Sequence, residues 1–297
     1  MTLYTQVASN RRKTGFYLVV YVLLIIALGG AISWYYGTPD ILLIAAVISI
    51  VQGWVSYYHS DSIALMVSHA EPLEQSAYPE AYKTVENLSI TAGLAMPRMY
   101  MIDDTAINAF ATGRDPKHAA IAVTRGALER LNQNELAGVL AHELSHVGNE
   151  DIRLSSMVAV MAGLIALIAD LFLRNMFWGR RGRNDNNGQA GAIIMVIALV
   201  LAVLAPIAAT LIQLAISRKR EFMADANGVL LTRYPEGLIS ALQKIGADAE
   251  PLEASNRATA HMYFSNPLKG GMHLFDTHPP IEERIAALEK GSGAKTV

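Results

Sequence analysis

Four long apolar stretches constrain the fold of this chain more than any other feature. They cover residues 16–36, 41–58, 154–172 and 192–216, and Asp170 is the one charged residue among them. Each stretch is close to or above the ~18–20 apolar residues that a helix needs to cross the hydrocarbon core of a bilayer. We therefore predict about four transmembrane helices, arranged as two hairpins, rather than the core helices of a soluble protein.

The composition agrees with a membrane protein and excludes several other classes. Of the 297 residues, 52% are hydrophobic and 17% are charged, whereas soluble domains carry about 25% charged residues. The net charge of −2 provides no basic surface for nucleic acid. Because the chain has no cysteine, a zinc ion would have to be held by His, Asp or Glu.

Positive charge sets the expected orientation in the membrane. Three basic residues at positions 11–13 precede the first apolar stretch, and the turn after that stretch contains no Lys or Arg. This asymmetry predicts a cytoplasmic N-terminus, with residues 59–153 and 218–297 also in the cytoplasm. The arginine-rich connection between the third and fourth stretches opposes this orientation, but the first hairpin usually dominates.

The remaining sequence predicts a small folded unit outside the bilayer. Short β-rich runs indicate strands at residues 98–102, 106–112 and 119–124, and helices are expected at residues 79–94, 125–131, 218–231, 235–245 and 280–288. The fold class is therefore mainly α with a small β-sheet (α+β). We expect four parts: a membrane hairpin (1–58), a cytoplasmic part (59–153), a second hairpin (154–217) and a second cytoplasmic part (218–297).

One motif outside the apolar stretches carries metal chemistry. Asn132 is the expected N-cap of an amphipathic helix that contains the run His142-Glu143-Leu144-Ser145-His146. On a helix the two histidines lie one turn apart on one face, so both imidazoles can bind one zinc ion. Glu143 lies beside them, where it can take a proton from a water that zinc activates. The alternative is a surface helix with two unrelated histidines.

A zinc hydrolase needs three protein ligands and one open position. Glu221 is the best third candidate, and Asp225, four residues later on the same helix face, could accept a hydrogen bond from a ligand histidine. Taken alone, Glu221 would be interpreted as a salt-bridge partner of its basic neighbours. Because His146 and Glu221 flank the second hairpin and would share one ion, the metal site is expected close to the membrane surface.

Several motifs occur in the order found in the HtpX family of heat-shock membrane proteases, which the chain resembles over nearly its whole length. They are the helix with the run His142–His146, the segment Glu221–Asp225, the strand Asn108–Gly113 and the run His278-Pro279-Pro280. The resemblance implies an integral membrane, zincin-like zinc endopeptidase of the bacterial inner membrane, with its active site in the cytoplasm. Such proteases act in stress response and quality control, on damaged or misfolded membrane proteins.

The same resemblance assigns roles to individual residues. It implies that His142, His146 and Glu221 bind zinc, that Glu143 is the catalytic carboxylate, and that Asp225 orients a ligand. In the related prenyl-protein proteases, a His and an Arg six residues later bind the substrate carbonyl, and the corresponding residues here are His278 and Arg284. The alternatives are that His278 caps a helix and that Arg284 is solvated.

The strand that contains Asn108, Ala109 and Phe110 resembles the strand that pairs with an extended substrate, although an ordinary sheet strand fits equally well. The expected partners are membrane-protein substrates and the lipid bilayer, not nucleic acid. The oligomeric state and the cleavage preference are left open. Two alternative functions fit parts of the sequence, a prenyl-protein protease with a narrow substrate and a scaffold with a relic site. The second is disfavoured because every catalytic position is filled.

Overall fold

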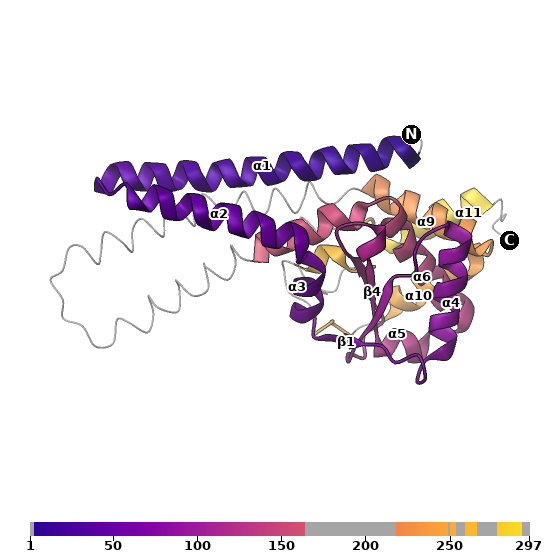
Figure 1. The fold of residues 1–297 in the computed structure, drawn as a ribbon. Coiled ribbons are helices and arrows are strands. Elements are labelled where there is room, and N and C mark those ends of the chain that lie inside the picture. Colours follow the sequence, from indigo (N-terminus) through magenta and orange to yellow (C-terminus); the bar gives the residue numbers. More distant parts are fainter. Residues whose placement is uncertain (1–2, 164–217, 249, 254–258, 266–277, 293–297) are drawn as a thin grey trace.

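The computed structural model describes residues 3–163, 218–248, 250–253, 259–265 and 278–292. These residues form a mainly helical protein with one small mixed sheet, as the sequence predicts (Figure 1). Residues 164–172 of the third apolar stretch and the whole fourth stretch lie outside the described residues, together with the arginine-rich connection between them. The number of four membrane spans therefore stays a prediction.

The N-terminal hairpin consists of α1 (Leu3–Tyr36) and α2 (Asp40–Tyr58), which lie side by side and project from the rounded body (Figure 1). Gly37 joins them with φ of 65°, a left-handed conformation that glycine adopts without steric cost. Among the described residues, α2 is the helix identified as long and apolar enough to cross a membrane. The predicted first span is the second part of α1, which begins well before that span.

The sheet has the order β1-β2-β4-β3 and contains both strand directions. Its strands are β1 (Ala70–Pro72), β2 (Arg98–Ile102), β3 (Ala109–Thr112) and β4 (Ala120–Thr124). β2 and β4 are parallel, whereas β1 pairs with β2 and β3 pairs with β4 in antiparallel fashion. β3 is therefore an edge strand of the sheet.

Three strands were predicted, but β3 begins at Ala109 rather than at residue 106. The reason is that side chains take the backbone N–H groups before it. Ile107 N donates to Asp248 Oδ2 (2.9 Å) and Asn108 N donates to Thr124 Oγ1 (2.9 Å). β1 was not predicted, because it is three residues long and ends in proline.

The helices of the body follow the predicted pattern closely. They are α3 (Ser60–Val67), α4 (Pro79–Ala92), η1 (Pro116–His118), α5 (Arg125–Arg130), α6 (Gln133–Gly148), α9 (Arg218–Thr232), α10 (Pro235–Ala247), η3 (Ala260–Met262) and α11 (Ile281–Ser292). Residues 151–163 are helical as well. α3 and the 3₁₀ turns were not predicted, since they are too short to show a clear hydrophobic period.

α6 is the central helix of the body, and it packs against α4, α9 and α10. Glycines allow the close approach of these helices. A Cβ atom on Gly138 would lie 2.8 Å from the backbone of Leu238 in α10, and one on Gly228 in α9 would lie 3.2 Å from the backbone nitrogen of His142. The short α6–α9 distance is what brings the residues of the two helices to one site.

Candidate metal centre

The start of α6 is fixed by a capping box and a buried carboxylate. Asn132 Oδ1 accepts a hydrogen bond from Glu135 N (3.0 Å), and Asn132 N donates to Glu135 Oε2 (2.7 Å). The Glu135 carboxylate also accepts hydrogen bonds from Lys244 Nζ and Ser240 Oγ of α10. These contacts fix the register of α6 and hence the direction of its histidines.

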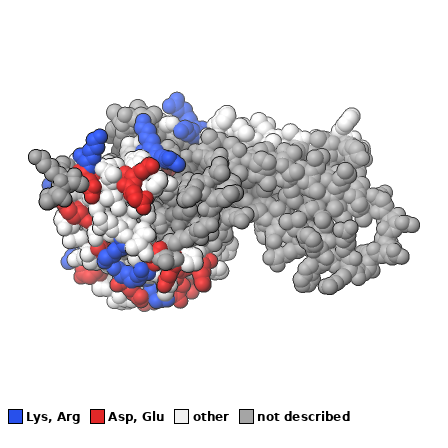
Figure 2. Space-filling view, turned by 180° about the vertical axis from the view of Figure 1, so that it is seen from behind, with Lys and Arg blue, Asp and Glu red and all other residues white. Residues whose placement is uncertain are grey.

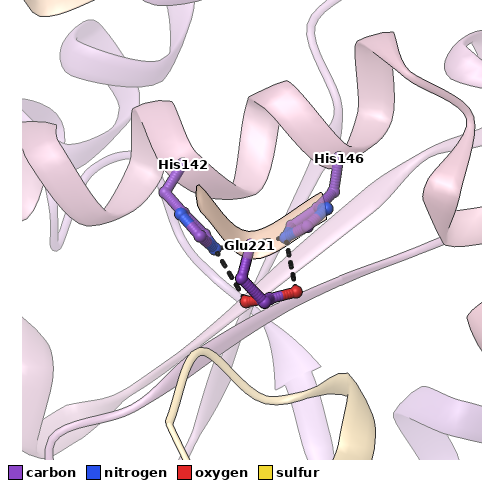
Figure 3. A group of neighbouring side chains, drawn as sticks. All are labelled: His142, His146 and Glu221. Atoms are coloured by element: carbon purple, nitrogen blue, oxygen red, sulfur yellow. Dashed lines mark hydrogen bonds and ion pairs between the residues drawn. The ribbon is translucent and has the colours of Figure 1, made fainter. Parts of the chain in front are cut away.

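His142, His146 and Glu221 point toward one another from two facing helices (Figure 3). The Nε2 atoms of the two histidines are 3.1 Å apart, and each lies 3.7 Å from an oxygen of Glu221. Two ligands of a tetrahedral zinc ion, each bound at 2.0–2.1 Å, lie about 3.3 Å from each other. The three side chains thus have the chemistry and nearly the spacing of a zinc site.

In both histidines, the ring nitrogen that faces away from the candidate metal position contacts a carboxylate. His142 Nδ1 is 2.8 Å from Asp225 Oδ1, and His146 Nδ1 is 3.1 Å from Asp151 Oδ2. A carboxylate accepts, so each Nδ1 carries the proton and each Nε2 of a neutral ring presents a lone pair. The two Nε2 atoms face each other at 3.1 Å, where each can give its lone pair to a metal ion once the ring is neutral. This arrangement is evidence that the residues fit a bound metal.

Asp225 was predicted from its spacing, whereas Asp151 was not. Asp151 lies three residues after the end of α6 at Gly148 and follows Glu150, whose left-handed φ of 55° interrupts the helix. Because Asp151 lies outside α6, helical spacing could not predict the contact. The one available sequence signal was an acidic residue placed shortly after the second histidine.

Arg284 is fully buried behind the histidine that Asp225 holds. Its guanidinium forms two parallel hydrogen bonds to Asp225, Nε to Oδ2 (2.9 Å) and Nη2 to Oδ1 (2.6 Å), and Nη1 donates to the carbonyl of Phe264 (3.0 Å). The Asp225 charge in turn raises the pKa of Arg284 against the effect of burial. The structure thus places Arg284 against Asp225 and the Phe264 carbonyl, with all three guanidinium nitrogens engaged.

Glu143 lies beside the histidines and is almost fully buried. Burial is the main cause that raises the pKa of its carboxyl group to about 7, and the nearby charge of Glu221 adds to the increase. The backbone N–H of Ala111 in β3 donates a hydrogen bond to the carboxylate and partly opposes this shift. A carboxyl group with a pKa near neutrality can both accept and release a proton.

The pKa values of the two histidines differ, because more carboxylates surround His146 than His142. Burial lowers the pKa of His142 to about 4, which leaves it neutral at pH 7. Burial acts on His146 in the same direction, but Asp151, Glu221 and Glu143 outweigh it and raise its pKa to about 9. The carboxylates around His146 therefore favour a positive charge, which a metal ion would provide.

His278 lies against the third candidate ligand, with its Nδ1 atom 3.0 Å from Glu221 Oε2. Burial opposes ionisation of Glu221, but the nearby His278 and the two other histidines hold its pKa well below the usual range. Among the described residues, the buried Nε2 atom of His278 has no hydrogen-bond partner. This residue lines the same cavity as His142, Glu143 and His146.

The edge of β3 is partly occupied by another segment of the chain. Phe264 N donates to the carbonyl of Ala109 (2.7 Å), and Tyr263 forms a bridge with Phe110. The side chain of Asn108 is hydrogen-bonded to the backbone of Ser265. The three residues predicted to bind substrate are therefore engaged by residues 263–265, whereas the next residue of β3, Ala111, lines the cavity.

The position of Arg284 predicts a stability effect. Substitution of Arg284 by Met would leave the buried carboxylate of Asp225 without its countercharge, so the free energy of unfolding should fall by about 3–5 kcal/mol. The matched control is Arg125→Met, since Arg125 pairs with the exposed Asp103, and an exposed pair contributes about 0–1 kcal/mol. Thermal unfolding of both variants in detergent measures the difference. A loss as small as that of the control, with lowered cleavage, would instead favour direct substrate binding by Arg284.

The comparisons with known proteins agree with this geometry. Residues 77–292 match peptidase family M48. A protein described as a Protease HtpX homolog from Caldanaerobacter subterraneus subsp. tengcongensis is 45% identical over 292 residues, which cover 97% of each chain. Another from Ligilactobacillus salivarius is 44% identical over 293 residues, which cover 97% of this chain and 99% of that protein. The crystal structure of S. mikatae Ste24p aligns with a TM-score of 0.49 and 19% identity over 97% of this chain and 66% of that chain. On the family match and the two relatives, the chain belongs to peptidase family M48, a family of metallopeptidases.

Proposed function

We propose that this protein is a zinc-dependent endopeptidase of the bacterial inner membrane, which cleaves damaged or misfolded membrane proteins at the cytoplasmic face. The observation that carries the chemistry is the convergence of His142, His146 and Glu221 beside the buried Glu143. Two imidazoles and one carboxylate form a known ligand set of catalytic zinc, with one position left for water or substrate. The role in stress response rests on the resemblance to the HtpX family.

The residues around the site support a general acid–base mechanism. When bound, zinc supplies a Lewis acid, which polarises the scissile carbonyl and acidifies the attacking water. Glu143 takes the proton of that water as the oxygen attacks the carbonyl carbon. The same carboxyl group then gives the proton to the amine nitrogen as the C–N bond breaks. Its raised pKa suits both steps near neutral pH.

His278 is proposed to stabilise the oxygen of the substrate carbonyl as negative charge develops there. Its Nδ1 atom is held by Glu221, while Nε2 is directed into the buried site without a hydrogen-bond partner among the described residues. In the protonated form both nitrogens donate, so Nε2 can donate to the oxyanion. Arg284 would support this chemistry by holding Asp225 and, through it, His142.

An extended substrate would add to the outer edge of β3, the edge that does not pair with β4. Such pairing uses backbone hydrogen bonds for affinity and leaves side chains to fit pockets. At Ala109 the carbonyl is taken by Phe264 N, and at Asn108 the side chain is taken by Ser265. Substrate binding at Asn108, Ala109 and Phe110 would therefore require residues 263–265 to move away from β3.

Membrane attachment supports membrane proteins as the substrate class. The hairpin of α1 and α2 exposes large apolar side chains, including Trp34 and Leu43. Figure 2 shows charged side chains of both signs on the rounded body. A body tethered to the bilayer encounters segments of other membrane proteins that emerge at the same surface.

The proposed mechanism predicts the effect of Glu143→Gln. This change keeps the shape of the side chain and removes the base, so cleavage of an unfolded protein such as casein should fall about 10²–10⁴-fold while zinc content stays unchanged. Glu129→Gln is the matched control, because Glu129 is exposed on α5. Full-length protein in detergent is measured for cleavage rate and metal content. Near-normal cleavage by the Glu143 variant would exclude this role.

The proposed orientation predicts how single cysteines react, which the cysteine-free chain makes simple to test. A Thr38→Cys residue in the exposed turn between α1 and α2 should react with a membrane-impermeant thiol reagent in intact spheroplasts. A Glu86→Cys residue, exposed on α4, should react after lysis alone. The opposite labelling pattern would place the candidate site outside the cytoplasm.

A further inference from the structure

The residues directly after α6 join the candidate zinc site to the N-terminal membrane hairpin. Asp151 is almost fully buried, and its carboxylate has contacts in two directions. One oxygen, Oδ2, lies 3.1 Å from Nδ1 of His146. The other, Oδ1, accepts a hydrogen bond from Asn10 Nδ2 (2.7 Å) and lies 3.5 Å from Nη1 of Arg220. Asp151, which contacts the candidate ligand His146, is thus itself hydrogen-bonded to Asn10 of α1.

Asn10 is as buried as Asp151, although the next three residues of α1, at positions 11–13, are exposed. Its Nδ2 group also donates to the carbonyl of Asn149 (3.0 Å). A single amide therefore contacts both ends of the turn at residues 149–151. Burial of a polar side chain is unfavourable unless it is hydrogen-bonded, so this exact pairing indicates a defined position rather than a passing contact.

Arg11, the next residue of α1, contacts the same turn at residues 149–151 but does not contact the metal site. Arg11 pairs with both oxygens of Glu150, at distances that include 2.9 Å for Nε to Oε2, and Arg153 also contacts that carboxylate. Farther along α1, Tyr21 packs in an apolar cluster with Leu154 and Met157 of the helix that follows the turn. α1 is therefore fixed to this part of the body along several helical turns.

We propose that the membrane hairpin forms part of the metal centre, because Asn10 positions His146 through Asp151. Asn10 is a positioning residue: it does not touch the metal or the substrate. It satisfies the Oδ1 atom of Asp151 and leaves Oδ2 aimed at Nδ1 of His146, which keeps Nε2 of that ring directed at the other two ligands. This inference rests on the proposed zinc site. It assigns to α1 a role in metal affinity as well as in anchoring.

The contacts predict different effects for adjacent residues of α1. Loss of a group that orients a metal-binding histidine typically weakens metal binding about 10–100-fold. Asp151→Ala should fall in that range, and Asn10→Ala should weaken zinc binding about 10-fold because Asp151 remains but is no longer oriented. Arg11→Ala removes a contact to the same turn but leaves the Asn10–Asp151–His146 chain intact, so its zinc affinity should stay within about twofold.

The test uses the full-length protein in detergent. Zinc affinity is measured by competition with a chromogenic chelator for wild type, Asn10→Ala, Arg11→Ala, Asp151→Ala, the double variant of residues 10 and 151, and His146→Ala. The absorption spectrum of cobalt-substituted protein reports the geometry of the ligands. We expect an altered cobalt spectrum for Asn10→Ala and no further loss of affinity when this change is added to Asp151→Ala.

Asn10→Leu gives the same comparison if alanine at position 10 loosens α1, since leucine nearly fills the space of the asparagine side chain and has no donor or charge. Equal losses in the Asn10 and Arg11 variants would mean that α1 merely stabilises the fold, and would overturn the proposal. Wild-type affinity and spectrum in both Asn10 variants would overturn it as well. Equal zinc affinity of wild type and His146→Ala would instead show that the zinc site itself is wrong.

Discussion

The hydrogen bonds that carboxylates make to the far side of two imidazoles determine the rest of this structure. Asp225 holds His142 and Asp151 holds His146, which fixes both rings in the tautomer that can bind a metal. Each carboxylate then requires a partner of its own, because both are buried. Arg284 of α11 meets Asp225, and Asn10 of α1 meets Asp151. Segments from both ends of the chain thus converge on one helix turn of α6.

Pairing of opposite charges explains how several buried carboxylates are tolerated around the candidate metal site. An unpaired buried charge costs several kcal/mol, and a pair offsets that cost when its geometry is good. Arg284 meets Asp225 through two parallel hydrogen bonds, and Glu221 is met by His278. Glu143 is the exception: its burial and the nearby charge of Glu221 raise its pKa to about 7, although His146 opposes this increase. The residue without a full countercharge is the one to which the mechanism assigns proton transfer.

The sequence predicted the parts of the site that depend on local spacing. The capped helix α6, its two histidines and the pair Glu221 and Asp225 all follow from helical periodicity, and the structure brings them together. Three of the four strands were predicted because their residues are β-rich and their ends are marked by turns. Resemblance to known proteases, rather than spacing, pointed to His278 and Arg284.

The contacts that were missed all depend on tertiary packing. Asp151 reaches His146 from beyond the left-handed residue Glu150, outside α6, and Asn10 contacts Asp151 across 141 positions of sequence. The pairing of Phe264 with Ala109 likewise joins distant segments, and neither segment has a pattern that predicts its partner. Local periodicity specifies which face of a helix is buried, but it does not specify which other segment covers that face.

Metal analysis of purified protein tests the central claim most directly. Wild-type protein and variants His142→Ala, His146→Ala and Glu221→Ala are dialysed against metal-free buffer, and the zinc that remains is measured for each chain. Since all three side chains converge on one point, we predict one zinc ion per wild-type chain and nearly none in any of the three variants. The variant His118→Ala, altered at an exposed histidine, should retain the full amount. Wild-type zinc content in folded His146→Ala or Glu221→Ala protein would contradict the assignment of these residues as ligands.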